Sequence, residues 1–152
     1  GLYKTIVDAV VYAKKMGYKN ILFLEDDIFF REQIKELDAY MEAVPNDWKL
    51  LYMGAHHIQR PIRVNERIVR NVQAFTTHSF AIDSSIFDLI INELFDINNL
   101  SYQVDLYFSD RIQSQLPTYS FFPNVTGQRP SVSDIEERFT DYTDNMDENL
   151  NV

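Results

Sequence analysis

A short apolar run that ends in three consecutive acids constrains this chain more than any other feature. Residues 19–30 read KNILFLEDDIFF, so the apolar residues 20–24 are followed directly by Glu25, Asp26 and Asp27. A strand that is apolar on both faces is typical of a sheet covered by helices on each side. We therefore expect residues 20–24 to form a central strand with three carboxylates at its carboxyl end.

Helical patterns surround this run. Apolar residues at helical spacing predict helices over residues 2–16, about 32–44, 85–95 and, as a short helix or helical turn, 104–115. Gly17 is expected to end the first helix, and Pro45 the second.

Further strands are expected between these helices. Residues 48–55 and 118–123 are each predicted to be a strand, and residues 67–75 and 78–84 are predicted to pair with each other. Alternating helices and strands predict an α/β fold. We expect a single core over residues 1–135, followed by an acidic, poorly ordered tail over residues 136–152.

Composition excludes several classes of function. The 152-residue chain has a formal net charge of -9 and no dense basic cluster, so a nucleic-acid partner is not expected. It has no cysteine, which excludes structural disulfides and thiolate metal sites. No apolar run approaches the ~20 residues that a membrane span needs, and we expect a cytoplasmic protein without one.

The three acids suit a hard cation. Residues two apart on a strand share a face, so Glu25 and Asp27 should lie on one side and Asp26 on the other if the strand continues that far. Ligands of open α/β sheets gather at the carboxyl ends of strands, and carboxylate oxygens there suit Mg²⁺ or Mn²⁺. A solvated turn with capping carboxylates is the alternative explanation.

A receiver domain of two-component signalling also has paired acids after a strand. That class needs a second strand ending in a phospho-accepting aspartate, and later a lysine. The next expected strand ends in YMGAHH, and no lysine follows Lys49. The sequence therefore argues against a receiver domain.

Five blocks in order resemble another family. They are YKNILFLEDD, DWKLLYMGA, TTHSFAIDSSIFDLI, VDLYF and QRPSVSDIE. Together they resemble glycosyltransferase family 25, which includes lipopolysaccharide glycosyltransferases and relatives of the collagen galactosyltransferases. The resemblance implies a GT-A-like (Rossmann-like) mixed sheet flanked by helices. It also implies an N-terminal truncation, because the strand and loop that bind the nucleotide base lie upstream of the first helix in that family. The missing strand would expose a sheet edge through which the chain could form a homo-oligomer.

The resemblance also implies site roles. Asp27, with Asp26, would hold Mn²⁺ or Mg²⁺ against the donor diphosphate, and Asp105 would be the catalytic base of an inverting transfer. Donor contacts would come from Glu25, Asp26, His78, Gln128 and Ser133. Two alternatives remain open: Asp105 could cap a helix, and His78 could be a core residue.

Three functions follow as hypotheses. The first is a metal-dependent glycosyltransferase, or part of one, that takes a nucleotide-sugar donor and a saccharide or other hydroxyl acceptor, as in lipopolysaccharide biosynthesis. The second is a catalytically degenerate binding or assembly module of the same descent. The third is a Mg²⁺-dependent phosphohydrolase, for which Asp83, Asp105 and Asp110 could supply further carboxylates.

Overall fold

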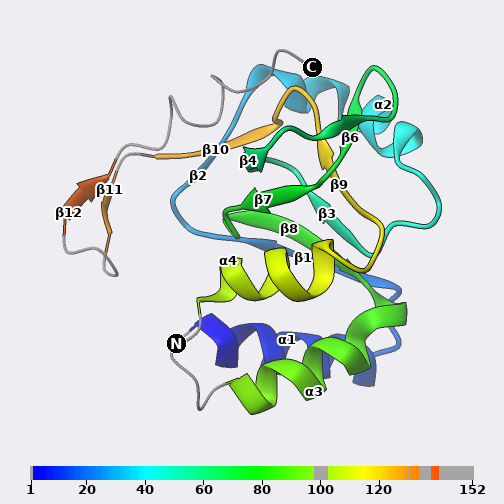
Figure 1. The fold of residues 1–152 in the computed structure, drawn as a ribbon, viewed down its shortest axis with the longest axis vertical. Coiled ribbons are helices and arrows are strands. Elements are labelled where there is room, and N and C mark those ends of the chain that lie inside the picture. Colours follow the sequence, from blue (N-terminus) through cyan, green and yellow to red (C-terminus); the bar gives the residue numbers. More distant parts are fainter. Residues whose placement is uncertain (1, 98–102, 130, 134–137, 141–152) are drawn as a thin grey trace.

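The protein has a mixed α/β fold built on one six-stranded sheet (Figure 1). The computed structural model describes residues 2–97, 103–129, 131–133 and 138–140. Its helices are α1 (Leu2–Lys15), α2 (Leu37–Ala43), α3 (Phe87–Ile97) and α4 (Val104–Tyr107). The strands of the large sheet are β1 (Asn20–Leu24), β3 (Leu50–Tyr52), β5 (Ile62–Arg63), β6 (Ile68–Arg70), β8 (Ser79–Asp83) and β9 (Thr118–Phe121).

Three strand pairs lie outside the large sheet. They are β2 (Ile28–Phe30) with β10 (Thr126–Gln128), β4 (His56–Gln59) with β7 (Gln73–Phe75), and β11 (Ser131–Ser133) with β12 (Arg138–Thr140). The order of the large sheet is β1-β8-β3-β9-β6-β5. The β3–β9 pair is parallel, and the other neighbours are antiparallel. It follows that β1, β3 and β9 run in the same direction.

Alternate residues of β3 face two separate cores. Leu50 and Tyr52 pack with apolar residues of α1, α3 and α4, whereas Leu51 packs with Tyr40 of α2. Helices therefore cover both faces of the sheet, as the α/β prediction requires. Each large apolar side chain buried in this way contributes roughly 1.5–3 kcal/mol.

The two predicted helix ends are confirmed. Gly17 has a φ of 71°, a left-handed conformation that suits glycine just beyond the end of α1. Val44 is extended with a ψ of 128°, because the ring of Pro45 disfavours helical geometry in the residue before it. The second helix begins as a 3₁₀ turn over Glu32–Glu36 before α2.

The prediction of a central first strand is wrong for the sheet described. β1 is an edge strand, and Leu22 and Leu24 on one of its faces are 48% and 46% exposed. The helix on that face, α2, packs against β3, β6 and β9 instead. In the sheet that the structure describes, β1 has a neighbouring strand on one edge only.

The predicted pairing of residues 67–75 with 78–84 is also wrong. The first segment divides into β6 and β7, and β8 pairs with β1 and β3. Buried Asn71 marks the division, since its backbone N–H donates to Thr118 O at 3.0 Å and its Oδ1 accepts from Ser120 Oγ at 2.6 Å. These bonds hold β6 on β9, and the chain then turns toward β4.

The expected acidic tail, residues 136–152, lies outside the described residues apart from β12, as does the expected boundary at residue 135. Within the part of the chain that the structure describes, none of the helices combines the length and apolar character needed to cross a membrane.

Candidate functional site

The acidic segment lies at the end of the sheet where β1, β3 and β9 all finish (Figure 1). Ligands of open α/β sheets collect at this end. The strands remain paired up to the acids, because the Glu25 backbone N–H donates to His78 O at 2.9 Å and the Met53 N–H donates to Ser79 O at 3.1 Å. The position of the first carboxylate is therefore set by the sheet.

Gln128 joins two of the three acids. Its Nε2 donates to Glu25 Oε2 at 3.2 Å and to Asp27 Oδ2 at 3.0 Å. Strand β10 carries Gln128 and pairs with β2 directly after the acids, with Gln128 opposite Ile28. A backbone bond from Arg129 N–H to Asp27 O, at 2.9 Å, extends this pairing. The late sequence block thus meets the acidic block about a hundred residues away along the chain.

The three acids differ in their surroundings. Glu25 and Asp27 are half-buried and both contact Gln128, while Asp26 is exposed. Strand alternation does not account for this arrangement, because β1 ends at Leu24 and Asp26 and Asp27 lie in a turn. Asp27 Oδ1 is buried and has no hydrogen-bond partner among the described residues. An oxygen of this kind is costly to bury unless something binds it. Asp27 therefore offers a lone pair to a ligand.

Asp105 adds a further carboxylate from α4. Burial raises its pKa, against hydrogen bonds from the Thr77 hydroxyl and the Thr76 backbone N–H. Its Oδ1 is buried, again without a hydrogen-bond partner in the described part of the chain. The cap alternative is wrong, because α4 begins at Val104 with Gln103 as its N-cap.

The raised pKa of Glu25 indicates that the other carboxylates lie close to it. Its pKa is raised from 4.5 to about 7, first by burial and then by the charges of Asp27, Asp105 and Asp26, in that order. All four contributions act in the same direction. At neutral pH the cluster therefore retains a proton or attracts a cation.

The residues present fit a divalent cation that is completed by other ligands. Within the described residues no group of three or more His, Cys, Asp or Glu side chains is arranged to hold a metal ion. The site instead offers two close carboxylates and an unsatisfied Asp27 oxygen. This donor set suits Mg²⁺ or Mn²⁺, because Mg²⁺ commonly binds one or two carboxylates together with water and substrate phosphates.

His78 is a core residue. Its side chain is fully buried, and its Nε2 lies 3.3 Å from Thr126 Oγ1. Burial, together with the charge of Arg31, lowers the pKa of His78 to about 4, so the ring is neutral. A Cβ on Gly54 would lie 2.9 Å from His78 Nε2 and 2.4 Å from Thr126 O. The ring is therefore packed against Gly54, just beyond β3, and Thr126 of β10, which supports the core alternative.

Two features around Asp105 were missed from the sequence. Thr76 has a φ of 79°, a conformation that β-branched residues rarely adopt and that costs roughly 1–3 kcal/mol. The expected helix over 104–115 becomes π-helical over Phe108–Gln113. Buried Gln113 there binds both backbone groups of Ala74, accepting from N at 2.8 Å and donating to O at 2.7 Å. Strained residues and π-helical turns concentrate at functional sites, but their sequence signals are weak.

Other candidates lie elsewhere. The backbone of Ser133 is in β11. Tyr119 and Phe121 are buried in the core that contains Tyr40 of α2, so their rings are not open to a ligand. Asp83, considered for a phosphohydrolase, lies at the opposite end of β8, where Asn20 is its partner on β1.

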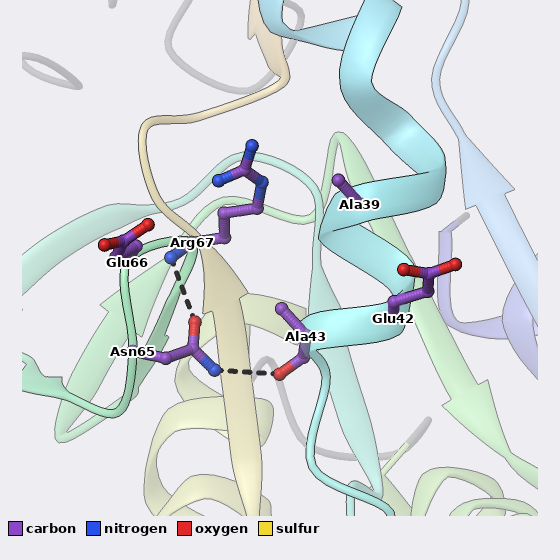
Figure 2. Close-up of a pocket in the computed structure, with 6 residues that line it drawn as sticks. All are labelled: Ala39, Glu42, Ala43, Asn65, Glu66 and Arg67. Atoms are coloured by element: carbon purple, nitrogen blue, oxygen red, sulfur yellow. Dashed lines mark hydrogen bonds between the residues drawn. The ribbon is translucent and has the colours of Figure 1, made fainter.

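A hollow of about 460 Å³ lies apart from the acids, between α2 and the β5–β6 turn (Figure 2). It is lined by Ala39, Glu42, Ala43, Asn65, Glu66 and Arg67. Asn65 bridges its walls, donating to Ala43 O and accepting from the Arg67 backbone N–H, both at 2.9 Å. These contacts explain the shape of the hollow and involve none of the acids of the candidate site.

Comparisons with known proteins add no assignment. No protein-family model matches the chain, and no curated protein matches it. The case for function therefore depends on the geometry of the acids and on the sequence blocks.

Proposed function

We propose that this chain is, or is part of, a metal-dependent glycosyltransferase that moves a sugar from a nucleotide-sugar donor to a hydroxyl acceptor. The observation that carries the proposal is the pairing of Glu25 and Asp27 on Gln128, with Asp105 close enough to raise the pKa of Glu25. The resemblance of the ordered blocks to glycosyltransferase family 25 supports it. The mixed α/β sheet is compatible with a GT-A-like fold.

Asp27 and Asp26 are the proposed cation ligands. Asp27 brings the buried, unsatisfied oxygen, and Asp26 is its exposed neighbour in the sequence. A Mn²⁺ or Mg²⁺ ion bound there would neutralise the donor diphosphate and stabilise it as a leaving group. The same ion would relieve the repulsion that raises the pKa of Glu25.

Glu25 and Gln128 are the proposed donor contacts. Near neutral pH Glu25 exchanges between an acceptor and a hydroxyl donor, and Gln128 brings a carbonyl and an NH₂ group. Together they could bind sugar or ribose hydroxyls. His78 acts indirectly in this scheme, by supporting the strand ends from the core.

Asp105 is the proposed base. In an inverting transfer it takes the proton of the acceptor hydroxyl while that oxygen bonds to the anomeric carbon. The bond from this carbon to the diphosphate oxygen breaks at the same time, and the nucleoside diphosphate leaves with the electron pair. Burial, which raises the pKa of Asp105, makes it a stronger base than an exposed aspartate.

Isothermal titration calorimetry tests the proposal. We would measure binding of UDP and UDP-sugars with and without Mn²⁺ to the wild type, to Asp27→Ala and to Asp8→Ala. Asp8 is a matched control, because it is exposed on α1 and pairs with Lys4. We expect Mn²⁺-dependent binding that is retained in the control and lost in Asp27→Ala.

Two results would contradict the proposal. Nucleotide binding that needs neither Mn²⁺ nor Asp27 would show that the acids do not form the nucleotide-binding site. Absence of nucleotide binding under every condition would show that the chain does not bind a nucleotide-sugar donor. Mn²⁺-dependent binding without measurable transfer would instead favour the binding-module hypothesis.

A further inference from the structure

The outer edge of β1 is open in the sheet that the structure describes, since β1 is the terminal strand and pairs with β8 alone. The backbone of Lys19 and that of Glu25 face β8, through bonds of 2.9 Å from Ser84 N–H to Lys19 O and from Glu25 N–H to His78 O. Alternate residues of a strand point their N–H and C=O groups to opposite sides. The groups that face the open edge therefore belong to Asn20, Leu22 and Leu24.

This edge lacks the features that normally prevent strand pairing. Its five residues, NILFL, contain no charge and no proline, and Leu22 and Leu24 are half-exposed. Edge strands are usually protected by charges, proline, bulges or shortness. The opposite edge strand, β5, has such protection, since it is two residues long, follows Pro61 and contains Arg63.

We propose that β1 pairs with β1 of a second copy of this chain, antiparallel and about a two-fold axis at Leu22. In this register Leu22 faces Leu22, Asn20 faces Leu24, and Ile21 faces Phe23. Every outward backbone group of one copy meets an outward group of the other, which gives about six hydrogen bonds. Two copies would then share one continuous sheet.

Charge complementarity selects this register and this occupant. Extending the pairing by one residue at each end places Lys19 of one copy opposite Glu25 of the other, with both side chains on the same face of the sheet. The strand is thus flanked by a lysine at its start and a carboxyl group at its end, and the lysine of an antiparallel copy would favour the ionised form of Glu25. A shift by two residues would lose one of the paired Leu residues and separate the two charges.

The pairing would also bring a cation to the candidate site, because Lys19 of the second copy would lie beside Glu25. It does not depend on the proposed function, since it follows from the strand edge alone. Failure of nucleotide binding would therefore leave it intact, and a monomeric protein would leave the glycosyltransferase proposal intact.

Disulfide trapping tests the register, and the chain suits it because it has no cysteine of its own. In a hydrogen-bonded pair the Cα atoms of two opposed residues are about 5.5 Å apart, within the range of a disulfide. Leu22→Cys should therefore form a covalent dimer under mild oxidation. Asn20→Cys on the same edge should not, because the two Asn20 residues would be separated by about 13 Å.

Sedimentation velocity over a wide range of protein concentration tests the interface. The wild type should dimerise, and Leu22→Lys should raise the dissociation constant by about tenfold or more, because two like charges would face each other. Ile62→Lys on β5 is the matched control, an exposed apolar residue of the opposite edge strand, and should have no effect. Lys19→Glu should weaken the dimer, and adding Glu25→Lys should restore it.

A wild type that stays monomeric at every concentration would overturn the proposal, as would a dimer that Leu22→Lys leaves unchanged. Equal cross-linking of Leu22→Cys and Asn20→Cys would overturn the register. Circular dichroism melting of each variant separates a loss of pairing from a loss of folding.

Discussion

The two ends of the β1–β8 pair hold carboxylates in opposite environments. At the start of β1, opposite Asn20, Asp83 accepts from Ser85 N–H at 3.0 Å and lies 3.6 Å from Lys49 Nζ. At the other end Glu25 meets Asp27, Asp105 and Asp26, whose charges all oppose its ionisation. Asp83 thus has a hydrogen-bond partner and an ion-pair partner within the protein. The carboxylates around Glu25 repel one another, and a bound cation would reduce this repulsion.

The pKa values express this difference. Although burial acts to raise the pKa of Asp83, hydrogen bonds from Ser85 and the charge of Lys49 lower it overall. For Glu25 burial is again the first contribution, and its neighbours add to it, so its pKa rises to about 7. Burial alone therefore does not decide the direction in which the pKa of a carboxyl group moves. The neighbours do.

The largest difference between the two ends should be in the effect of substitutions on the rate of sugar transfer. Asp105→Asn should lower the rate of sugar transfer by about 10²-fold or more, because the amide cannot take a proton, and should leave Mn²⁺-dependent donor binding intact. Asp83→Asn, at the other end, should leave transfer unchanged. Single-turnover transfer and calorimetry measure the two properties separately. Equal loss of transfer in both variants would remove the functional distinction between the two ends.

A further carboxylate should destabilise the acidic end. Gln128→Glu replaces the amide that donates to Glu25 and Asp27 with a further anion, and should lower the free energy of unfolding by about 1–3 kcal/mol. Gln128→Leu is the control without the added charge and should cost less. Urea unfolding with and without Mn²⁺ checks this prediction. If Mn²⁺ does not recover more stability in Gln128→Glu than in Gln128→Leu, the repulsion is not what the cation relieves.

Loss of the Asp83 side chain should cost as much stability as loss of a helix N-cap. Asp83→Ala removes the bond to Ser85 N–H and the pair with Lys49, and should cost about 1 kcal/mol. Asp8→Ala on exposed α1 should cost less than about 0.5 kcal/mol. Addition of Mn²⁺ should change neither value. A Mn²⁺-dependent stability of Asp83→Ala alone would show that the two ends are coupled.

The smallest effect should be the pH dependence of stability. The folded-state pKa of Glu25, about 7, lies above its unfolded value of 4.5, so its stabilising contribution is complete below pH 4.5 and is lost as the pH rises through 7. Asp83, with a lowered pKa, loses its contribution as the pH falls below about its unfolded value. Glu25→Gln should therefore flatten the decline in Tm between about pH 5 and pH 8, and Asp83→Asn should not. Calorimetric melting across this range checks both.

Some of this arrangement could be predicted from local sequence. The ends of α1 and α2 follow from Gly17 and Pro45, whose backbone preferences act within a residue or two. These predictions succeeded because the forces that decide them operate over a few residues.

Other parts depend on contacts that are distant in sequence. The edge position of β1 is set by which strands α2 covers, and the division of residues 67–75 is set by Asn71 bonding to β9. The contact of Gln128 with the acids needs the β2–β10 register, and the strain at Thr76 is visible only in three dimensions. None of these has a periodic signature that a single sequence could reveal.

Gly54 carries a lesson for anyone who would move this site to another scaffold. An added methyl group there would meet Thr126 O at 2.4 Å and Thr126 Oγ1 at 2.7 Å, so β10 lies directly against the end of β3. Gln128 is two residues further along that strand. A LEDD motif transferred without the Gly54–Thr126 contact would carry the acids but would lack the Gln128 amide that binds Glu25 and Asp27. Gly54 therefore has to be transferred together with the motif.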